Sequence, residues 1–162
     1  LALLGGSPPA AGAANDATFE YCAAEASELG SVVNDMTPVC FNTLGERDDY
    51  LSEMGVGDSV ARAVAANTIL GTVYKNSNRG GASLTLWGSS GCAGVTFGFA
   101  SLAAGWNNSI SSAEGKNGCW VTLYTASSYG GNRLNCTPYC STVGTWNDNV
   151  ASLVFRPAGT FG

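Results

Sequence analysis

The stretch WNDNVASLVF, residues 146–155, resembles a phrase that occurs earlier in the chain, WNNSISS, residues 106–112. Each phrase follows a tyrosine and a glycine, which are Tyr74 with Gly81 and Tyr124 with Gly131. The tyrosines and glycines are related by one constant offset, whereas the two tryptophans are related by a shorter one. The chain therefore contains two copies of one framework, and the second copy has lost residues from a loop.

The segments around both phrases have the alternating pattern of strands. From Ile69 onward, short runs rich in β-branched and aromatic residues (TVY, SLTLW, VTFGF, WVTLY and ASLVF) are separated by clusters of Gly, Ser and Asn. Such runs bounded by turn residues predict strands rather than helices. We therefore expect residues 69–162 to form an all-β domain.

The second copy, YTASSYGG followed by WNDNVASLVF, resembles a Greek-key motif of the βγ-crystallin superfamily, and VYKNSNRGG followed by WNNSISS is similar. Microbial members of that superfamily include secreted peptidase inhibitors and killer-toxin-like proteins. The resemblance implies a mainly β protein in which two Greek-key motifs, from about Leu70 to Phe155, form one β-sandwich. One departure is Arg79, which stands where the family has an aromatic residue, so the first hairpin lacks the folded-over ring contact expected of Tyr129 in the second.

The resemblance also implies a calcium site in the two repeated loops. The matching positions are Asn107, Asn108, Ser109 and Ser111 in the first loop and Asn147, Asp148 and Asn149 in the second. One site would combine the Ser109 carbonyl, the Ser111 hydroxyl and the Asp148 carboxylate. The other would have the Asn149 carbonyl and the Asn108 amide, but Ala151 replaces its hydroxyl residue. With one carboxylate, Ca²⁺ binding should be weak and unequal between the sites. Alternatively, these side chains only satisfy backbone groups of their own loops.

The N-terminal part differs from the β domain in charge and in pattern. Residues 1–58 carry ten acidic residues and one basic residue, and residues 59–162 carry six basic and two acidic ones, which gives net charges of −9 and +4. Residues 1–16 are interpreted as the remnant of a signal peptide or as a linker, and residues 17–68 as an acidic helical extension. The acidic part either presents solvated helix faces or docks on the basic part.

Three helices are expected in this extension. The first covers residues 17–29 and stops at Gly30, the second opens at a capping box of Thr43 and Glu46 and closes at Gly55, and the third runs from Asp58 or Ser59 to Ala66. Residues 38–41 are expected to be extended.

Six cysteines and few lysines indicate an exported protein with disulfide bonds. Fifteen pairings are possible for six cysteines. Cys22 and Cys40 are the only two in the acidic part, and Cys136 and Cys140 can close a small loop, which leaves Cys92 for Cys119. We therefore expect three local crosslinks and a secreted location.

The residue types present exclude several functions. The chain has no histidine, which removes Ser-His-Asp and Cys-His catalysis and His-ligated metals. Its bases are too few and scattered for a nucleic-acid surface, and no run reaches the roughly 20 apolar residues of a membrane span. We interpret the protein as a non-enzymatic Ca²⁺-binding module.

Two alternatives use the same fold. The first is a peptidase inhibitor of a secreted protease, in which the Cys136–Cys140 bridge would stiffen Thr137, Pro138 and Tyr139 as an inhibitory loop. The second is an antimicrobial, killer-toxin-like protein that acts on a cell-surface target and whose acidic part is an inhibitory partner.

Overall fold

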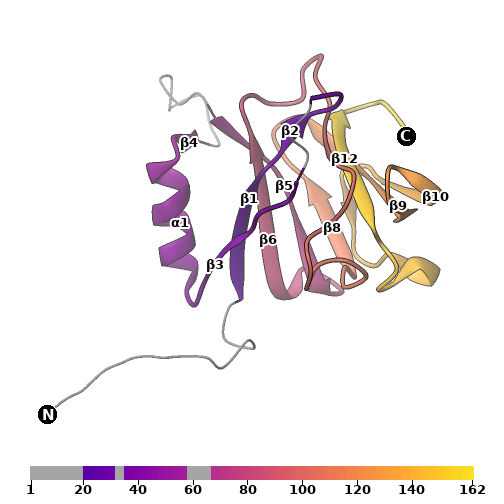
Figure 1. The fold of residues 1–162 in the computed structure, drawn as a ribbon, viewed down its shortest axis with the longest axis horizontal. Helices are drawn as coiled ribbons and strands as arrows, with labels where there is room; N and C mark the ends of the chain where they lie inside the picture. Colours follow the sequence, from indigo (N-terminus) through magenta and orange to yellow (C-terminus); the bar gives the residue numbers. More distant parts are fainter. Residues whose placement is uncertain (1–19, 32–34, 58–66) are drawn as a thin grey trace, which may run out of the picture.

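The computed structural model describes residues 20–31, 35–57 and 67–162, and these residues form two β-sheets packed face to face with one α-helix at the side (Figure 1). The first sheet has the order β11-β8-β5-β6-β1-β3, with β4 also paired to β5, and the second has the order β10-β9-β12-β7-β2. The expected mainly β fold is therefore confirmed, and the two sheets also include the N-terminal strands β1 to β4.

The two repeated segments supply the central strands of the two sheets. The first copy consists of β5 (Asn67–Asn76), β6 (Gly80–Gly88), β7 (Phe97–Phe99) and β8 (Ser112–Gly115). The second consists of β9 (Cys119–Ala126), β10 (Gly130–Cys136), β11 (Tyr139–Cys140) and β12 (Ser152–Pro157), with the 3₁₀ turn η4 (Gly144–Trp146) before β12. Each copy keeps three strands in its own sheet and gives its third strand, β7 or β11, to the other. Two Greek keys are thus interlocked.

The main core lies between the sheets. Alternate residues of the central strands point inward and are fully buried; they include Leu70, Val73, Leu84 and Leu86 from one sheet and Val121, Leu123, Leu153 and Phe155 from the other. Phe97 and Phe99 on the exchanged strand β7 belong to the same cluster. The exchanged strand is therefore held by side-chain packing as well as by its pairing with β12.

The N-terminal part extends both sheets instead of forming a separate layer. β1 (Tyr21–Glu25) pairs in parallel with β6, β3 (Val39–Phe41) pairs with β1, and β2 (Ser27–Glu28) pairs with β7 in the second sheet. The helix predicted for residues 17–29 is therefore wrong over the described residues 20–29. The small residues Cys22, Ala23 and Ala24 are buried in β1, where pairing with β6 on one side and β3 on the other outweighs the helix preference of alanine.

The second predicted helix is confirmed. α1 (Leu44–Glu53) starts after Thr43, whose side chain accepts from the Glu46 N–H at 3.1 Å while Glu46 reaches back to the Thr43 N–H at 3.2 Å. Gly55 follows the helix with φ of 73°. Residues 38–41 lie largely in β3 as expected. The third predicted helix falls on residues 58–66, which lie outside the described residues.

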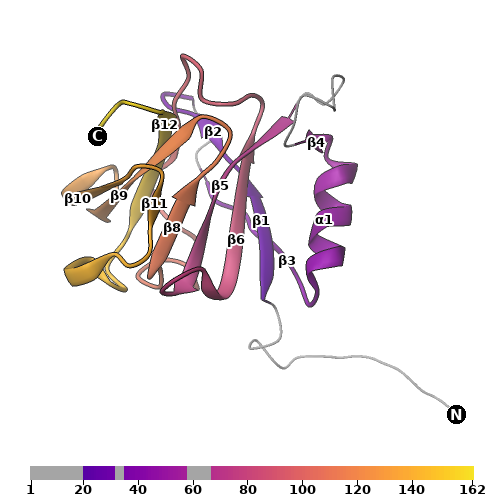
Figure 2. The same ribbon diagram turned by 180° about the vertical axis from the view of Figure 1, so that it is seen from behind.

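A smaller core fixes α1 on the outer face of the first sheet. Leu51 of α1 and Val56 of β4 (Val56–Gly57) pack with Ala23 and Trp87, all buried. In Figures 1 and 2, α1 lies beside β1, β3 and β4 and far from β9 and β10. The helix covers part of this face, and Ile69 of β5 packs against the small core that the helix forms.

All three expected disulfides are present. They are Cys22–Cys40, Cys92–Cys119 and Cys136–Cys140, with sequence separations of 18, 27 and 4 residues. Cys22–Cys40 ties β1 to β3, and Cys92–Cys119 fixes the segment after β6 to the start of β9. Each crosslink closes a loop of the unfolded chain and so reduces the entropy that folding has to overcome.

Gly71 is a position where only glycine fits. A Cβ there would collide with the Glu114 carbonyl oxygen of the neighbouring strand and with the Phe155 ring of the opposite sheet. We predict that Gly71→Ala lowers the free energy of unfolding by about 3 kcal/mol, because neither the backbone nor the buried ring can move aside.

Urea unfolding of Gly71→Ala should be compared with Gly45→Ala. Gly45 lies in α1, and a Cβ added to it would meet nothing within 4 Å, so this change should raise stability by about 0.5 kcal/mol. Equal stability of Gly71→Ala and wild type would contradict the close approach of the sheets at Gly71.

Candidate functional site

The two repeated loops, residues 106–111 and 146–151, bind each other through equivalent backbone hydrogen bonds. The Asn108 N–H donates to the Val150 carbonyl at 2.9 Å, and the Asp148 N–H donates to the Ile110 carbonyl at 3.2 Å. Asn108 and Asp148 have nearly identical left-handed backbones, with φ of 61° and 60°. The loops are therefore related by a pseudo-twofold axis, and each holds the other in place.

Each loop is also attached to the first hairpin of its own copy. The Ser111 N–H donates to the Tyr74 carbonyl at 2.9 Å, and the Ala151 N–H donates to the Tyr124 carbonyl at 2.8 Å. Tyr74 and Tyr124 thus occupy equivalent positions, which confirms the repeat predicted from the sequence.

The serine after each loop locks the adjacent hairpin. Ser112 donates to the Asn76 carbonyl and Ser152 to the Ala126 carbonyl, both at 2.7 Å. Each hydroxyl also accepts a hydrogen bond from a backbone N–H of the folded-over hairpin. The Ser112 hydroxyl accepts from the Arg79 N–H at 3.1 Å, and the Ser152 hydroxyl accepts from the Tyr129 N–H at 3.0 Å. These bonds give both loops a rigid base.

The two loops bring one expected pair of side chains together. The Ser111 hydroxyl, which is buried, donates to Oδ1 of the exposed Asp148 carboxylate at 3.4 Å. The hydroxyl and the carboxylate come from different loops, as the resemblance required. Ser109, whose carbonyl belongs to the same expected set, turns its own hydroxyl to the Asn107 carbonyl at 3.4 Å.

The equivalent set on the other side has no such pair. Ala151 occupies the position equivalent to Ser111 and offers no hydroxyl to Asn108. The Asn149 amide donates to the Asn147 carbonyl at 3.0 Å, so it satisfies a backbone group of its own loop. The two sides of the loop pair therefore differ in their side-chain contacts. Among the described residues, no group of three or more acids or cysteines could hold a metal, so any ion at these loops depends on hydroxyl, amide and carbonyl oxygens besides Asp148.

The Cys136–Cys140 loop does not present Tyr139 to solvent. Thr137 and Pro138 are exposed, but the Pro138 carbonyl accepts the Gly115 N–H at 2.9 Å and β11 pairs with β8. The Tyr139 ring is half-buried beneath the Arg79 guanidinium, whose carbon lies 3.8 Å from the ring centroid. These contacts make the loop part of the first sheet, whereas an inhibitory loop needs a side chain that projects into a protease.

Known structures resemble about half of this chain. A βγ-crystallin domain from Flavobacterium johnsoniae is 27% identical, with a TM-score of 0.40, over 57% of this chain and 99% of that domain. A βγ-crystallin from an archaeon is 27% identical, with a TM-score of 0.40, over 55% and 96%. The N-terminal domain of protein S is 20% identical, with a TM-score of 0.42, over 56% and 99%. The two Greek keys of this chain, with β7 and β11 exchanged between the sheets, have the arrangement that the sequence resemblance implies, so the fold is βγ-crystallin-like.

No protein-family model and no curated protein matches the chain. No helix in the described part of the chain is long and apolar enough to cross a membrane.

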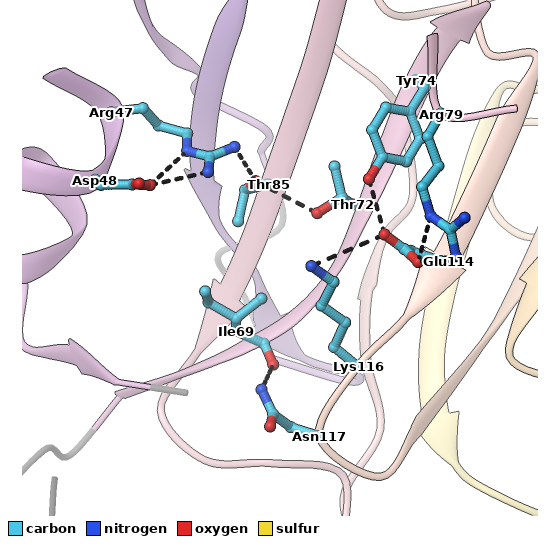
Figure 3. A network of polar contacts seen from close by, with 10 residues as sticks. All are labelled: Arg47, Asp48, Ile69, Thr72, Tyr74, Arg79, Thr85, Glu114, Lys116 and Asn117. Atoms are coloured by element: carbon cyan, nitrogen blue, oxygen red, sulfur yellow. Dashed lines mark hydrogen bonds and ion pairs between the residues drawn. The ribbon is translucent and has the colours of Figure 1, made fainter. Parts of the chain in front are cut away.

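The two hairpins of the βγ-crystallin-like fold are stabilised differently. In the second, the Tyr129 ring packs edge-on against Tyr124 with centroids 5.8 Å apart. In the first, Arg79 replaces that ring and binds Glu114 of β8 through Nη2 at 2.9 Å and Nε at 3.0 Å. Glu114 also accepts the Tyr74 hydroxyl at 2.8 Å (Figure 3). An ion pair thus takes the place of the missing ring contact.

This network changes the proton affinity of its members. Burial raises the pKa of Tyr74 to about 12, and the hydrogen bond to Glu114 adds to the effect. Burial alone would raise the pKa of Glu114, but the hydrogen bonds from Arg79 and Tyr74 and the charges of Lys116 and Arg79 leave it below the usual value of 4.5. Glu114 therefore carries its charge, and Tyr74 its proton, at neutral pH.

Sequence reasoning assigned no role to Glu114, Arg47 or Lys116. Arg47 of α1 and Lys116 at the end of β8 lie over the outward face of the first sheet, close to Thr72 and Thr85 (Figure 3). Their separation in sequence gave no sign that α1 covers this face. One signal in the sequence pointed to this site: the polar residues Thr72, Ser83 and Thr85 alternate with apolar residues in the segments that form β5 and β6.

The lowered pKa of Glu114 predicts a pH-dependent contribution to stability. The pKa of such a carboxyl group is lower in the folded state than in the unfolded state. The group therefore stabilises the fold at pH values above its unfolded pKa, and this stabilisation is lost as the pH falls through its folded pKa. Wild type should therefore be more stable than Glu114→Gln at pH 7, and the difference should shrink as the pH falls below about 4.5.

Urea unfolding of both proteins at several pH values between 7 and 3 measures this difference. Arg79→Met should reproduce part of the loss at pH 7, because it removes the strongest partner of Glu114. A difference between wild type and Glu114→Gln that is constant across this range, or grows at low pH, would contradict the pairing.

Proposed function

We propose that this protein is an exported, non-enzymatic βγ-crystallin-like protein that binds one Ca²⁺ ion weakly at its paired loops. The observation that carries the proposal is the 3.4 Å approach of the Ser111 hydroxyl to the Asp148 carboxylate across the loop pair. Hydroxyl, carboxylate and carbonyl oxygens are the ligands that Ca²⁺ prefers. The Ser109 carbonyl completes the set implied by the resemblance.

The loops support an ion without a large rearrangement. Asn108 and Asp148 are already left-handed, and the reciprocal backbone hydrogen bonds hold both loops at a fixed separation. Little conformational entropy would therefore be lost on binding, which favours affinity. Ca²⁺ would take the place of the Ser111 hydroxyl hydrogen as the partner of Asp148, with the loops kept at their present separation. The role of the ion would be to stiffen this end of the sandwich.

One carboxylate limits the affinity. Sites with few charged ligands fall in the extracellular class, with dissociation constants of about 10⁻⁴ to 10⁻³ M. Such a site is filled where Ca²⁺ is abundant, and three disulfides are stable in the same oxidising surroundings. Affinity and crosslinking both favour an extracellular location.

Calorimetric titration with Ca²⁺ tests the proposal. Wild type should bind one ion, and Asp148→Asn should lose most of the binding, because the only carboxylate of the site is gone. Asp49→Asn is the matched control: it removes one negative charge from an exposed position of α1 and should leave binding unchanged. Equal binding by Asp148→Asn and wild type would mean that the loops serve structure alone.

The asymmetry of the loops predicts a gain as well. Asn108→Asp combined with Ala151→Ser should give the second side the same carboxylate and hydroxyl pair, because the backbone there already matches the first side. The number of bound ions should then rise from one toward two, with the new site at least as strong as the first. Two ions of equal affinity in wild type would contradict the assignment of ligands.

A further inference from the structure

A cavity of about 220 Å³ lies on the outer face of the first sheet, and none of its lining residues belongs to the two repeated loops. Its floor is formed by β5 and β6, one wall by α1, and the opposite side by Lys116 after β8. Pockets for drug-sized ligands measure roughly 300 to 1,000 Å³. A cavity of this size therefore suits a ligand with a single ring.

The register of the strands fills the floor with hydroxyl groups. Thr72 of β5 lies opposite Thr85 of β6, and Tyr74 lies opposite Ser83. The intervening residues Val73 and Leu84 point into the main core, so these four hydroxyl side chains point outward. Thr72, Ser83 and Thr85 are buried although they face away from the core. The Thr72 and Thr85 hydroxyls bond to each other at 3.4 Å and the Ser83 hydroxyl donates to the Glu20 carbonyl at 3.5 Å, so these hydroxyl oxygens keep acceptor capacity for a polar ligand.

Two cations approach this floor from opposite sides. Arg47 donates from Nη1 to the Thr85 hydroxyl at 2.9 Å and from Nε and Nη2 to Asp48 at 3.2 and 2.9 Å. Two of its five N–H groups have no partner among the described residues. The Lys116 ammonium has one charged neighbour in this part of the chain, Glu114, at 3.8 Å, which is beyond hydrogen-bond distance. Both cations thus keep donors for a ligand.

The neighbouring carboxylate does not cancel this positive charge. Glu114 Oε1 is held by Arg79, and its Oε2 accepts the Tyr74 hydroxyl. Its charge is therefore already compensated within the hairpin network. The charged residues that line the cavity are Arg47 and Lys116, and both are cations; the carboxylates they contact, Asp48 and Glu114, are not among the lining residues.

We propose that the cavity binds a carboxylate-bearing sugar of one ring, such as a uronic acid. The carboxylate would lie between Arg47 and Lys116, which Figure 3 places on either side of Thr72 and Thr85. The ring hydroxyls would exchange hydrogen bonds with Thr72 and Ser83, and the apolar face of the ring would lie against Tyr21 and Ile69. Arg47 and Lys116 would favour a ligand with a carboxylate, and the hydroxyl groups of the floor would favour a ligand with several hydroxyl groups.

Titration of the full chain with glucuronate, glucose, acetate and inorganic phosphate tests this site. Ca²⁺ is removed with a chelator, so that the result is independent of the loops. Glucuronate should bind saturably at millimolar concentration. Glucose should bind at least tenfold more weakly than glucuronate, because it lacks the carboxylate. Acetate and phosphate should also bind at least tenfold more weakly, because they lack the sugar ring.

Matched variants locate the binding. Lys116→Met should weaken glucuronate about tenfold, and Thr72→Val should weaken it several-fold. Lys75→Met is the control, because Lys75 packs over Trp106 outside the cavity and its loss should not change binding. Thermal unfolding of each variant confirms that it is folded.

Four results would overturn the proposal. These are equal binding of glucose and glucuronate, equal binding of acetate or phosphate and glucuronate, no saturable binding of glucuronate by folded wild type, and an equal loss of binding in Lys75→Met and Lys116→Met.

Discussion

The sandwich of this protein and its paired loops depend on the exchange of third strands between the two repeats. β7 completes the sheet of the second copy, and β11 completes the sheet of the first. Neither copy can therefore form its full sheet without the other, and the two halves of the core form together. In each copy the chain returns from the exchanged strand to its own sheet through one of these loops, residues 106–111 between β7 and β8 and residues 146–151 between β11 and β12, and the two returns lie side by side. A site shared between the loops is a direct product of this topology.

The features that could be predicted from the sequence are those set by local pattern or by repetition. Turn residues and alternation marked the strands of residues 69–162, and the two tryptophan phrases marked the equivalent loops and the single Ser111 and Asp148 pair. The Thr43 and Glu46 capping box predicted α1, because capping is decided within one turn. The three disulfides were predicted correctly because each joins two cysteines that are neighbours in the order of the sequence.

The features that could not be predicted are set by contacts distant in sequence. Residues 21–25 carry alanines that favour a helix, yet they form β1 because β6 offers an open edge. Nothing near Tyr21 in the sequence reveals that edge. Arg79 was recognised as a missing aromatic residue, but its compensation by Glu114, 35 residues away, depends on the pairing of β5 with β8. The polar floor below α1 is hidden for the same reason.

The N-terminal strands also change where the first sheet ends. Without them, the outermost strand would be β6, with nine residues of unpaired backbone along one side. β1 pairs with five of these residues, Ser83 to Trp87, and β3, which is three residues long and crosslinked to β1, becomes the new border. Long open borders of sheets recruit strands from other molecules, whereas short ones do so poorly. The N-terminal strands thus give this side of the first sheet a short, crosslinked border, which disfavours pairing with strands of other molecules.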